Sequence, residues 1–393
     1  RRQRQMCIRD SILTSISMLV GIIAMIGSFL VGTLGKDYLI SVNAQMYGWT
    51  PTYSYSITDS DFQDSIKMEE FFYKIREIDD CVTITFDMRE NIIFAPIVSV
   101  SSLQGAANDI YKKVVPVDVV LTTTAYNKIY NLPMSSGSWF SYSETEKSLC
   151  MVVNKEAESY FNTPYAVGNT GSSLSLTPFN VTGTVNDGKD IPTVYLDAQA
   201  VEEFLPNMWQ VQNASVYWHL TKGLTTNQMY SSLDDILQDT IGGHIEYSGR
   251  SDIGDAYDSV LSMLQLGLLI TSFLLLFVSV LGQINIGLSS LEQRTYELLI
   301  RRAIGASRIN IVALVLGTQL VISIFVCIVS ILLSILIVEG IGIFLPPDTP
   351  VASPAYPFFS AVVAVVASVT VALLGGLLPA LKAAKLEPAL ALR

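Results

Sequence analysis

The sequence predicts a polytopic α-helical membrane protein with four transmembrane helices and a large α+β domain outside the membrane. Of the 393 residues, 50% are hydrophobic and only 15% are charged, against about a quarter charged in soluble domains. Four long stretches lack charged residues, and a membrane-spanning helix needs about 20 apolar residues. We assign these stretches as transmembrane segments 11–35, 259–282, 309–338 and 357–381. Between the first two lies segment 36–258, which has the hydrophilic composition and the length of a folded domain.

The first hydrophobic segment is interpreted as an uncleaved transmembrane helix rather than a signal peptide. It is free of charge from Ser11 to Gly35, which exceeds the apolar core of a signal peptide, about 7 to 15 residues. The sequence begins at Arg1 rather than Met. We therefore also consider that the chain is a fragment of a longer polypeptide.

The distribution of positive charge predicts the topology. Eleven of the 24 Lys and Arg residues lie in segments 1–10, 283–308 and 382–393, whereas loop 339–356 has none. Because Lys and Arg concentrate on the cytoplasmic side, both termini and segment 283–308 are expected in the cytoplasm. Segment 36–258 carries 29 acidic and 13 basic residues. This outer domain is therefore not expected to bind nucleic acid or anionic lipid.

Two parts of segment 36–258 share a β-α-β pattern. Residues 53–57 and 82–86 alternate as strands on either side of an amphipathic helix at 68–78. Residues 215–220 and 244–247 do the same around a helix at 226–240, with Thr226 as its expected cap. This repetition predicts a split α/β unit completed by both halves. Between them, at about 114–197, we expect a β-rich insertion with short strands at 114–121, 150–153, 173–176, 180–185 and 193–196.

Small residues form stripes on two of the transmembrane segments. They recur every four residues as Ala24, Ser28 and Gly32 in the first segment, and as Ala372, Gly376 and Ala380 in the fourth. Such stripes let helices pack closely in lipid. We expect them to offer a face to a second, symmetric chain.

Segment 283–308 is predicted to contain a short amphipathic helix, at about 289–303, lying at the inner membrane surface. Leu291 and Leu298 share one face, while Glu297 can pair with Arg294 and Arg301 on the other. Gly305 is a natural helix end and Ser307 a natural cap for the next helix. A solvated loop is the alternative.

Motifs for chemistry within the chain are absent from the sequence. It has no phosphate-binding Walker motif, nucleophile elbow, HExxH or paired-cysteine motif. His219 and His244 are interpreted as ordinary strand residues, and we expect neither metal nor cofactor. The predicted spans contain no Asp, Glu, Lys or Arg, which disfavours an ion-driven transporter. Whether Cys81 and Cys150 form a disulfide stays open.

Several segments resemble the FtsX-like and MacB-like permease family. Residues 292–294 (EQR) and 297–307 (ELLIRRAIGAS) are similar to the cytoplasmic loop of these permeases, and 376–393 (GLLPALKAAKLEPALALR) to their C-terminal signature. Residues 151–157 (MVVNKEA) and 180–185 (NVTGTV) resemble strands of the MacB-type core domain. The resemblance implies a MacB-like fold with a porter-like outer unit.

The resemblance also implies a non-catalytic permease subunit of an ABC transporter of the mechanotransmission kind, in a bacterial cytoplasmic membrane. A separate cytoplasmic ATPase would bind ATP and Mg and dock on the loop helix, and two permease chains, identical or different, would form a dimer. Leucines would fill a groove of the ATPase and arginines would orient it. The expected ATPase-coupling residues are Leu291, Glu292, Arg294, Glu297, Leu298, Leu299, Arg301, Arg302 and Gly305.

Three functions are compatible with that family. The first is export or extraction of peptides, antibiotics or lipoproteins, with an envelope adaptor or cargo at the outer domain. The second is an FtsX-like scaffold that activates a cell-wall hydrolase, and the third is an antimicrobial-peptide sensing or resistance complex. The sequence does not name the cargo or the type of cell envelope.

Overall fold

The computed structural model describes residues 2–78, 81–99, 113–141, 149–170, 176–221, 223–351 and 355–385. The chain divides into two compact units. The helical unit comprises residues 1–37, 258–344 and 353–393, and the sheet unit comprises residues 38–257 and 345–352.

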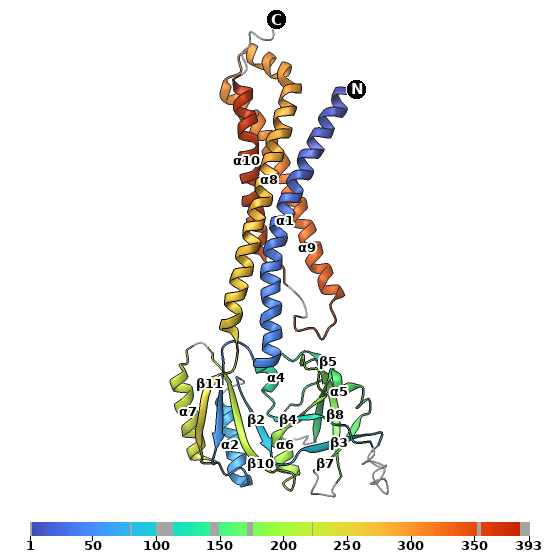
Figure 1. Cartoon of the computed structure of the whole chain (residues 1–393), viewed down its shortest axis with the longest axis vertical. Coiled ribbons are helices and arrows are strands. Elements are labelled where there is room, and N and C mark those ends of the chain that lie inside the picture. The colour runs from blue at the N-terminus through green and yellow to red at the C-terminus, as the bar shows by residue number, and fades with distance from the viewer. Residues whose placement is uncertain are drawn as a thin grey trace. The chain divides into compact units, whose positions relative to one another are not determined.

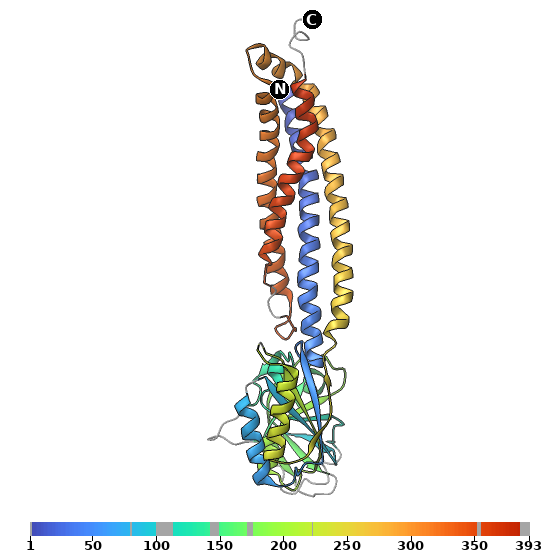
Figure 2. The same ribbon diagram turned by 90° about the vertical axis from the view of Figure 1, so that its left-hand side faces the viewer.

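Four long helices build the helical unit. They are α1 (Arg2–Tyr47), α8 (Gly254–Ala303), α9 (Arg308–Phe344) and α10 (Phe358–Ala384), and they run side by side in Figures 1 and 2. Within the described residues, all four are long and apolar enough to cross a membrane. The four predicted transmembrane helices are therefore confirmed, although each observed helix extends beyond the charge-free stretch that predicted it.

Close packing in the helical unit uses small residues and a few polar contacts. On α1, a side chain at Gly21 would come within 2.8 Å of Ser279 in α8, and Lys36 lies 3.9 Å from Asp258. Between α9 and α10, the hydroxyl of Ser323 donates to the carbonyl of Ser368 at 2.7 Å. Hydrogen bonds and small side chains associate helices where hydrophobicity gives no drive.

The small-residue stripe of α10 packs inside this chain, which corrects the expectation that it faces a second chain. Ala372 and Ala380 are completely buried, and a side chain at Gly376 would lie 3.1 Å from Leu316 of α9. The stripe on α1 differs, because Ala24 and Ser28 are only half-buried and Gly32 faces Gln265 of α8. Contact of the α1 stripe with a second chain stays a prediction.

The sheet unit is built on one mixed sheet of 11 described strands. The strands are β1 (Thr52–Thr58), β2 (Val82–Met88), β3 (Ile92–Ile97), β4 (Asp118–Thr122), β5 (Met134–Gly137), β6 (Cys150–Asn154), β7 (Tyr165–Thr170), β8 (Thr177–Val185), β9 (Thr193–Asp197), β10 (Val211–His219) and β11 (His244–Arg250). Their order is β11-β1-β10-β2-β4-β9-β6-β8-β7-β3, and β5 pairs with β8. The helices are α2 (Ser65–Ile78), α4 (Tyr126–Ile129), α5 (Lys155–Glu158), α6 (Ala198–Phe204) and α7 (Thr226–Asp239).

The split α/β unit is confirmed by the strand order. The units β1-α2-β2 and β10-α7-β11 interleave as β11-β1-β10-β2, with every neighbour antiparallel. This is the order of the split β-α-β motif. Helix α7 begins at Thr226 as expected, but its cap is Thr225 rather than Thr226, and Thr225 forms a capping box with Gln228.

The β-rich insertion continues the same sheet. Strand β4 pairs with β2 through Thr85 and Thr122, and the remaining strands follow outward from it. The strand expected at 114–121 starts later, at Asp118. Of the strand expected at 173–176, residues 173–175 lie outside the described residues. Strands β3, β5 and β7 were not predicted.

The strand order also separates the two cysteines whose pairing was left open. Cys81 precedes β2, Cys150 begins β6, and strands β4 and β9 lie between these two. Neighbouring strands are about 4.8 Å apart, so the cysteines are about 14 Å apart, beyond the reach of a disulfide at about 7 Å. The structure therefore does not join them.

The main core of the sheet unit lies between the sheet and its helices. Helices α2 and α7 cover the face turned toward the viewer in Figure 2. Phe72 of α2 is 3% exposed and its ring meets Phe86 of β2 and Trp209 at centroid distances of 5.7 and 6.5 Å. Aromatic side chains therefore supply much of the buried area.

Replacing Phe72 by Ala is expected to lower the free energy of unfolding of the sheet unit by about 3–5 kcal/mol, because it removes a buried ring and leaves a cavity. All four tryptophans of the chain, Trp49, Trp139, Trp209 and Trp218, belong to this unit. Tryptophan fluorescence during denaturant unfolding of the full chain measures the change. As a control on the same helix, Ile66→Ala removes a side chain that is 80% exposed and should change stability by less than about 0.5 kcal/mol.

Candidate functional site

The first candidate site is the α8–α9 turn, defined here as residues 289–310. After α8 ends, the N–H of Ala306 donates to the carbonyl of Arg301, and that of Gly305 to Arg302, both at 3.1 Å. Gly305 has φ +108°, which a side chain would disfavour. This pair of bonds is a Schellman motif. Ser307 then caps α9 by accepting from Asn310 N–H at 3.2 Å, so the expected helix end and cap are both confirmed.

The expected separate helix at 289–303 is wrong, because α8 is one helix from Gly254 to Ala303. Its interior has no proline. Good helix formers such as Leu291, Glu292 and Gln293 follow the apolar stretch, so the helix continues through them. Gly287 does not break it. A side chain there would lie 2.8 Å from Pro379 of α10, so close helix packing accounts for this glycine.

The leucines expected to fill a partner's groove are buried in this chain instead. Leu291, Leu298 and Leu299 are 7%, 5% and 4% exposed. Leu291 and Leu298 form an apolar cluster with Ile311 of α9 and Ala383 of α10. They therefore hold the turn together, and this corrects their predicted role in contacting another protein.

A different apolar stripe faces outward on the same turn. Tyr296, Ile300 and Ile304 are 68%, 41% and 81% exposed and recur every four residues, and Ile309 beyond the turn is 78% exposed. Residues four apart share a helix face. We call Tyr296, Ile300, Ile304 and Ile309 the exposed stripe. The sequence analysis missed it, although its four-residue spacing within a charged segment was the available signal.

The charged residues of the turn divide between outward and inward roles. Glu297 and Arg301 form an exposed pair at 3.0 Å, and Glu292 is also exposed. Arg302 instead donates through Nη1 to the carbonyl of Ala384, the last residue of α10, at 3.1 Å. A cation at a helix C-terminus is favourable. Arg294 is half-buried beside Glu297 and Leu298, where it lines a small cavity.

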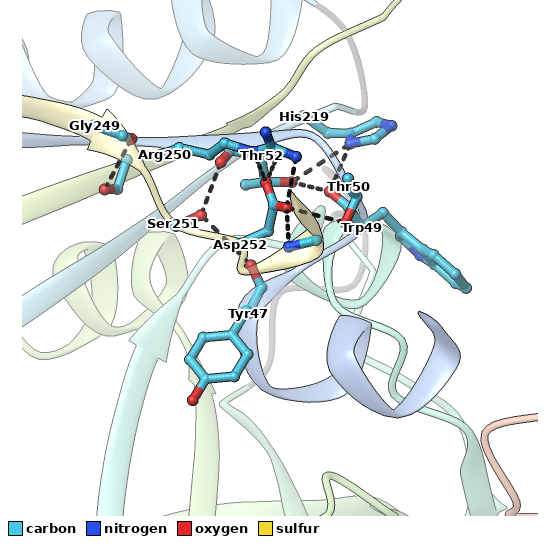
Figure 3. Close-up of polar contacts among 11 residues, drawn as sticks. Tyr47, Trp49, Thr50, Thr52, His219, Gly249, Arg250, Ser251 and Asp252 are labelled. Carbon is cyan, nitrogen blue, oxygen red and sulfur yellow. Dashed lines mark hydrogen bonds and ion pairs between the residues drawn. The ribbon is translucent and has the colours of Figure 1, made fainter. Parts of the chain in front are cut away.

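The second candidate site is the start of α8, where the Asp252 carboxylate joins three segments (Figure 3). Its oxygens accept from Thr52 N–H at 2.9 Å at the start of β1, and from Arg250 Nε at 2.8 Å at the end of β11. They also accept from Gly254 N–H, the first residue of α8, at 2.9 Å, and from Thr50 Oγ1 at 3.0 Å. One buried side chain thus fixes where α8 leaves the sheet.

The α1 end of the chain is tied to the same place. Ser251 Oγ donates to the carbonyl of Thr52 at 3.1 Å and to that of Tyr47, the last residue of α1, at 3.5 Å. His219 Nδ1 lies 3.0 Å from the carbonyl of Trp49, so this histidine serves the junction. The ends of α1 and α8 in the sheet unit therefore share one hydrogen-bonded junction, which Figure 3 shows.

The electrostatics of Asp252 follow from these contacts. Burial acts to raise its pKa, but the hydrogen bonds from Arg250 and from the backbone of Thr52 and Gly254 outweigh burial, so the net pKa is lowered. Its side chain is 0% exposed. The carboxylate is therefore held in its charged form inside the junction.

The third candidate site is loop 345–351 between α9 and α10, which is bound to the β-rich insertion. Asp348 is 5% exposed and accepts from Lys155 Nζ at 2.7 Å and from Ser135 Oγ at 2.9 Å. Asn131 donates to the carbonyls of both Ser41 in α1 and Pro350 in the loop, each at 3.1 Å.

Asn186 adds a second bridge of the same kind. Its Nδ2 donates to the carbonyl of Asp348 at 2.9 Å, and its own carbonyl accepts from Gln45 of α1 at 2.8 Å. Two asparagines thus hold the end of α1 and the α9–α10 loop on the insertion. We call Asn131, Ser135, Lys155, Asn186 and Asp348 the loop clip.

The described residues give no comparable evidence for a catalytic or metal-binding site. Among the residues that the structure describes, no group of three or more His, Cys, Asp or Glu side chains is placed to hold a metal ion. His244 lies 3.7 Å from Asp59 on the exposed surface. The polar contacts instead join the ends of α1 and α8 and loop 345–351 to the sheet within the sheet unit.

Comparison with known proteins agrees with a multi-pass membrane protein that has a large α/β domain. Residues 11–236 match the model of the MacB-like periplasmic core domain, and residues 269–388 match that of the FtsX-like permease C-terminal region. The chain belongs to the FtsX-like and MacB-like family of ABC transporter permeases. It is a membrane protein whose large domain lies outside the cell membrane.

One curated relative and two solved structures are similar over parts of the chain. The macrolide export ATP-binding/permease protein MacB of Mannheimia succiniciproducens is 38% identical over 127 residues, 32% of this chain and 19% of that protein. The periplasmic region of MacB from Actinobacillus actinomycetemcomitans has 12% identity and a TM-score of 0.34, covering 54% of this chain and 93% of that one. The extracellular domain of the noncanonic ABC-type transporter YknZ from Gram-positive bacteria has 10% identity and a TM-score of 0.31, covering 49% and 100%.

Asp252→Asn is expected to destabilise the sheet unit at neutral pH by about 1.5–3 kcal/mol, since it removes a charged acceptor and turns an NH₂ group toward N–H donors. Because the pKa of Asp252 is lowered on folding, its contribution is present above the ordinary value of about 3.9 and is lost as pH falls through the lowered value. Unfolding of both proteins between pH 7 and pH 3 should therefore show a shallower loss of stability for the variant. Asp235→Asn, at an exposed site on α7, serves as the control, and equal pH profiles for Asp252→Asn and wild type would contradict the assignment.

Proposed function

We propose that this chain is the membrane subunit of an ABC exporter whose outer domain is moved by a separate ATPase docked on the α8–α9 turn. The observation that carries the proposal is the exposed stripe. It places three large apolar side chains, Tyr296, Ile300 and Ile304, on the last turns of a helix whose other end is fixed to the sheet by Asp252. Exposed apolar patches bordered by charges are typical of protein interfaces.

Helix α8 is suited to carry a displacement along its length. It has 50 residues without a proline, which corresponds to about 75 Å at 1.5 Å per residue. Proline is a main cause of sharp kinks, and α8 has none. A push on the turn would therefore reach Gly254 with little loss to local bending.

The partner must supply the ATP chemistry. The sequence has no Walker motif, so ATP and Mg would be held by the separate ATPase in the cytoplasm. The positive charges of the turn and termini support its placement on the cytoplasmic side. The exposed pair Glu297–Arg301 and the nearby Glu292 would give the contact its orientation.

Export is favoured over the other family functions by the relative named for macrolide export. The cargo class would be peptides, antibiotics or lipoproteins taken from the outer face, with two permease chains, identical or different, forming the machine. A scaffold for a cell-wall hydrolase and an antimicrobial-peptide sensing complex are the alternative outcomes of the experiment below.

The double substitution Tyr296→Asp plus Ile300→Asp is expected to abolish recovery of the ATPase when the tagged chain is purified from its native membrane, because two charges would be buried in an apolar contact. Tyr296→Phe plus Ile300→Leu keeps apolar side chains at the same two positions and should keep the ATPase bound. Membrane insertion of all variants is checked by fractionation.

The same purification distinguishes the candidate functions. An ATPase together with an envelope adaptor or cargo supports export, whereas an ATPase together with a wall hydrolase would replace it with the scaffold function. Normal ATPase recovery with the double variant would refute the docking site, and recovery of no ATPase with the wild-type chain would refute the proposal as a whole.

The loop clip provides a second test, of mechanical coupling. Asp348→Ala removes the contacts to Lys155 and Ser135, so ATP hydrolysis by the complex should persist while export falls. In a background without native cysteines, Ser135→Cys plus Asp348→Cys should restore export when oxidised and lose it again with reductant, because the disulfide replaces the hydrogen bond. Equal export by Asp348→Ala and wild type would show that the clip does not transmit motion.

A further inference from the structure

Two glutamines of the helical unit carry buried amide oxygen atoms that lack a hydrogen-bond partner among the described residues. Gln283 of α8 is 1% exposed, and neither its Nε2 nor its Oε1 has a hydrogen-bond partner among the described residues. The Oε1 of Gln319 in α9 is likewise buried without one. Buried polar groups are normally paired, with protein or with ordered water.

Both glutamines lie against the same pair of residues in α10, Gly375 and Gly376. A side chain at Gly375 would collide with Oε1 of Gln283, and one at Gly376 would lie 3.3 Å from Cγ of Gln319. The two glycines thus make room for two amide side chains. Polar groups from α8 and α9 are thereby brought to one place on α10.

Pro379 adds a third unsatisfied group at this place. It lies inside α10, four residues after Gly375, and has no N–H to donate to the Gly375 carbonyl. Proline in a membrane helix is tolerated where side chains or ordered water satisfy the freed carbonyl. The amide of Gln283, the amide oxygen of Gln319 and the freed carbonyl of Gly375 therefore need hydrogen-bond partners beside Gly375 and Gly376.

A cavity reaches this region from the α8–α9 turn. Its volume is about 90 Å³, and its lining includes Pro379 and Gln319 together with Ser290, Arg294, Glu297 and Thr318. Glu297 is 61% exposed, so this part of the lining meets solvent. Its lining combines these polar side chains with apolar ones such as Leu314 and Val315, and it has room for several water molecules.

We propose that this cavity is a water-binding crevice that enters the helical unit from the α8–α9 turn. Of the groups that lack partners, only Gln319 lines the cavity itself. Water that passes from the cavity between Gln319 and Pro379 bonds to Gln319 Oε1, to the carbonyl of Gly375 and to the Gln283 amide beyond the lining. Water in the crevice links α8, α9 and α10 near Pro379 through hydrogen bonds that can break and re-form. This inference does not depend on which protein binds the exposed stripe.

Cysteine labelling tests the crevice, because methanethiosulfonates react with thiolates, which form in water. Gln319→Cys is compared with Gly317→Cys and Val321→Cys in the full chain, free of native cysteines and reconstituted in lipid nanodiscs. The controls lie two residues before and after on α9, outside the cavity lining, so their average depth matches. Gly317 has open space around it and Val321 is 69% exposed, so both sites accommodate a cysteine.

We expect a small water-soluble methanethiosulfonate to modify Gln319→Cys while both flanking thiols stay unmodified. Equal modification of all three, or none at residue 319, overturns the proposal. An experimental map of the wild-type chain in nanodiscs provides the second measurement, which needs no variant. Water density within hydrogen-bond distance of Gln319 Oε1 and the Gly375 carbonyl supports the crevice, and protein partners for these atoms refute it.

Discussion

The buried carboxylate of Asp252 is the interaction on which the connection between helix and sheet depends. It receives hydrogen bonds from the start of β1, the end of β11 and the first residue of α8. Several charge-assisted hydrogen bonds to one carboxylate fix the orientation of the three segments as well as the distances between them. Because α1 also ends at this junction, one cluster holds the two ends of the chain segment that forms the sheet.

Because α8 is one continuous helix from Gly254 to Ala303, its last turns do not form a separate surface helix. A separate surface helix could rock freely, whereas the last turns of a 50-residue helix move with its whole length. The leucines that looked available for a partner hold α8 against α9 and α10, and the large apolar side chains left exposed on the turn are those of the exposed stripe. Within the sheet unit, the loop clip holds loop 345–351 on the β-rich insertion through Asp348 and two asparagines.

Polar groups within the helical unit are concentrated where backbone geometry is irregular. The serines of α9 and α10 satisfy themselves on nearby carbonyls, as Ser323 does on Ser368. Gln283 and Gln319 instead meet a glycine pair and a proline, where a carbonyl is released. In a low-dielectric environment such groups are costly unless solvated, and the cavity opening near Glu297 offers that solvation.

The sequence by itself determined the four transmembrane helices, the split α/β unit and the end of α8 at Gly305, because charge-free length, strand alternation and helix-ending glycine are local signals. It did not determine that α8 is unbroken, that the stripe of α10 faces α9, or that Leu291 and Leu298 are internal. Tyr296, Ile300 and Ile304 have the same spacing as a buried face. Which apolar face of a helix is covered depends on the helices packed beside it, and the bonds of Asp252 and Asp348 join residues more than 190 positions apart. Such contacts leave no periodic pattern in one sequence, so only the tertiary structure could decide them.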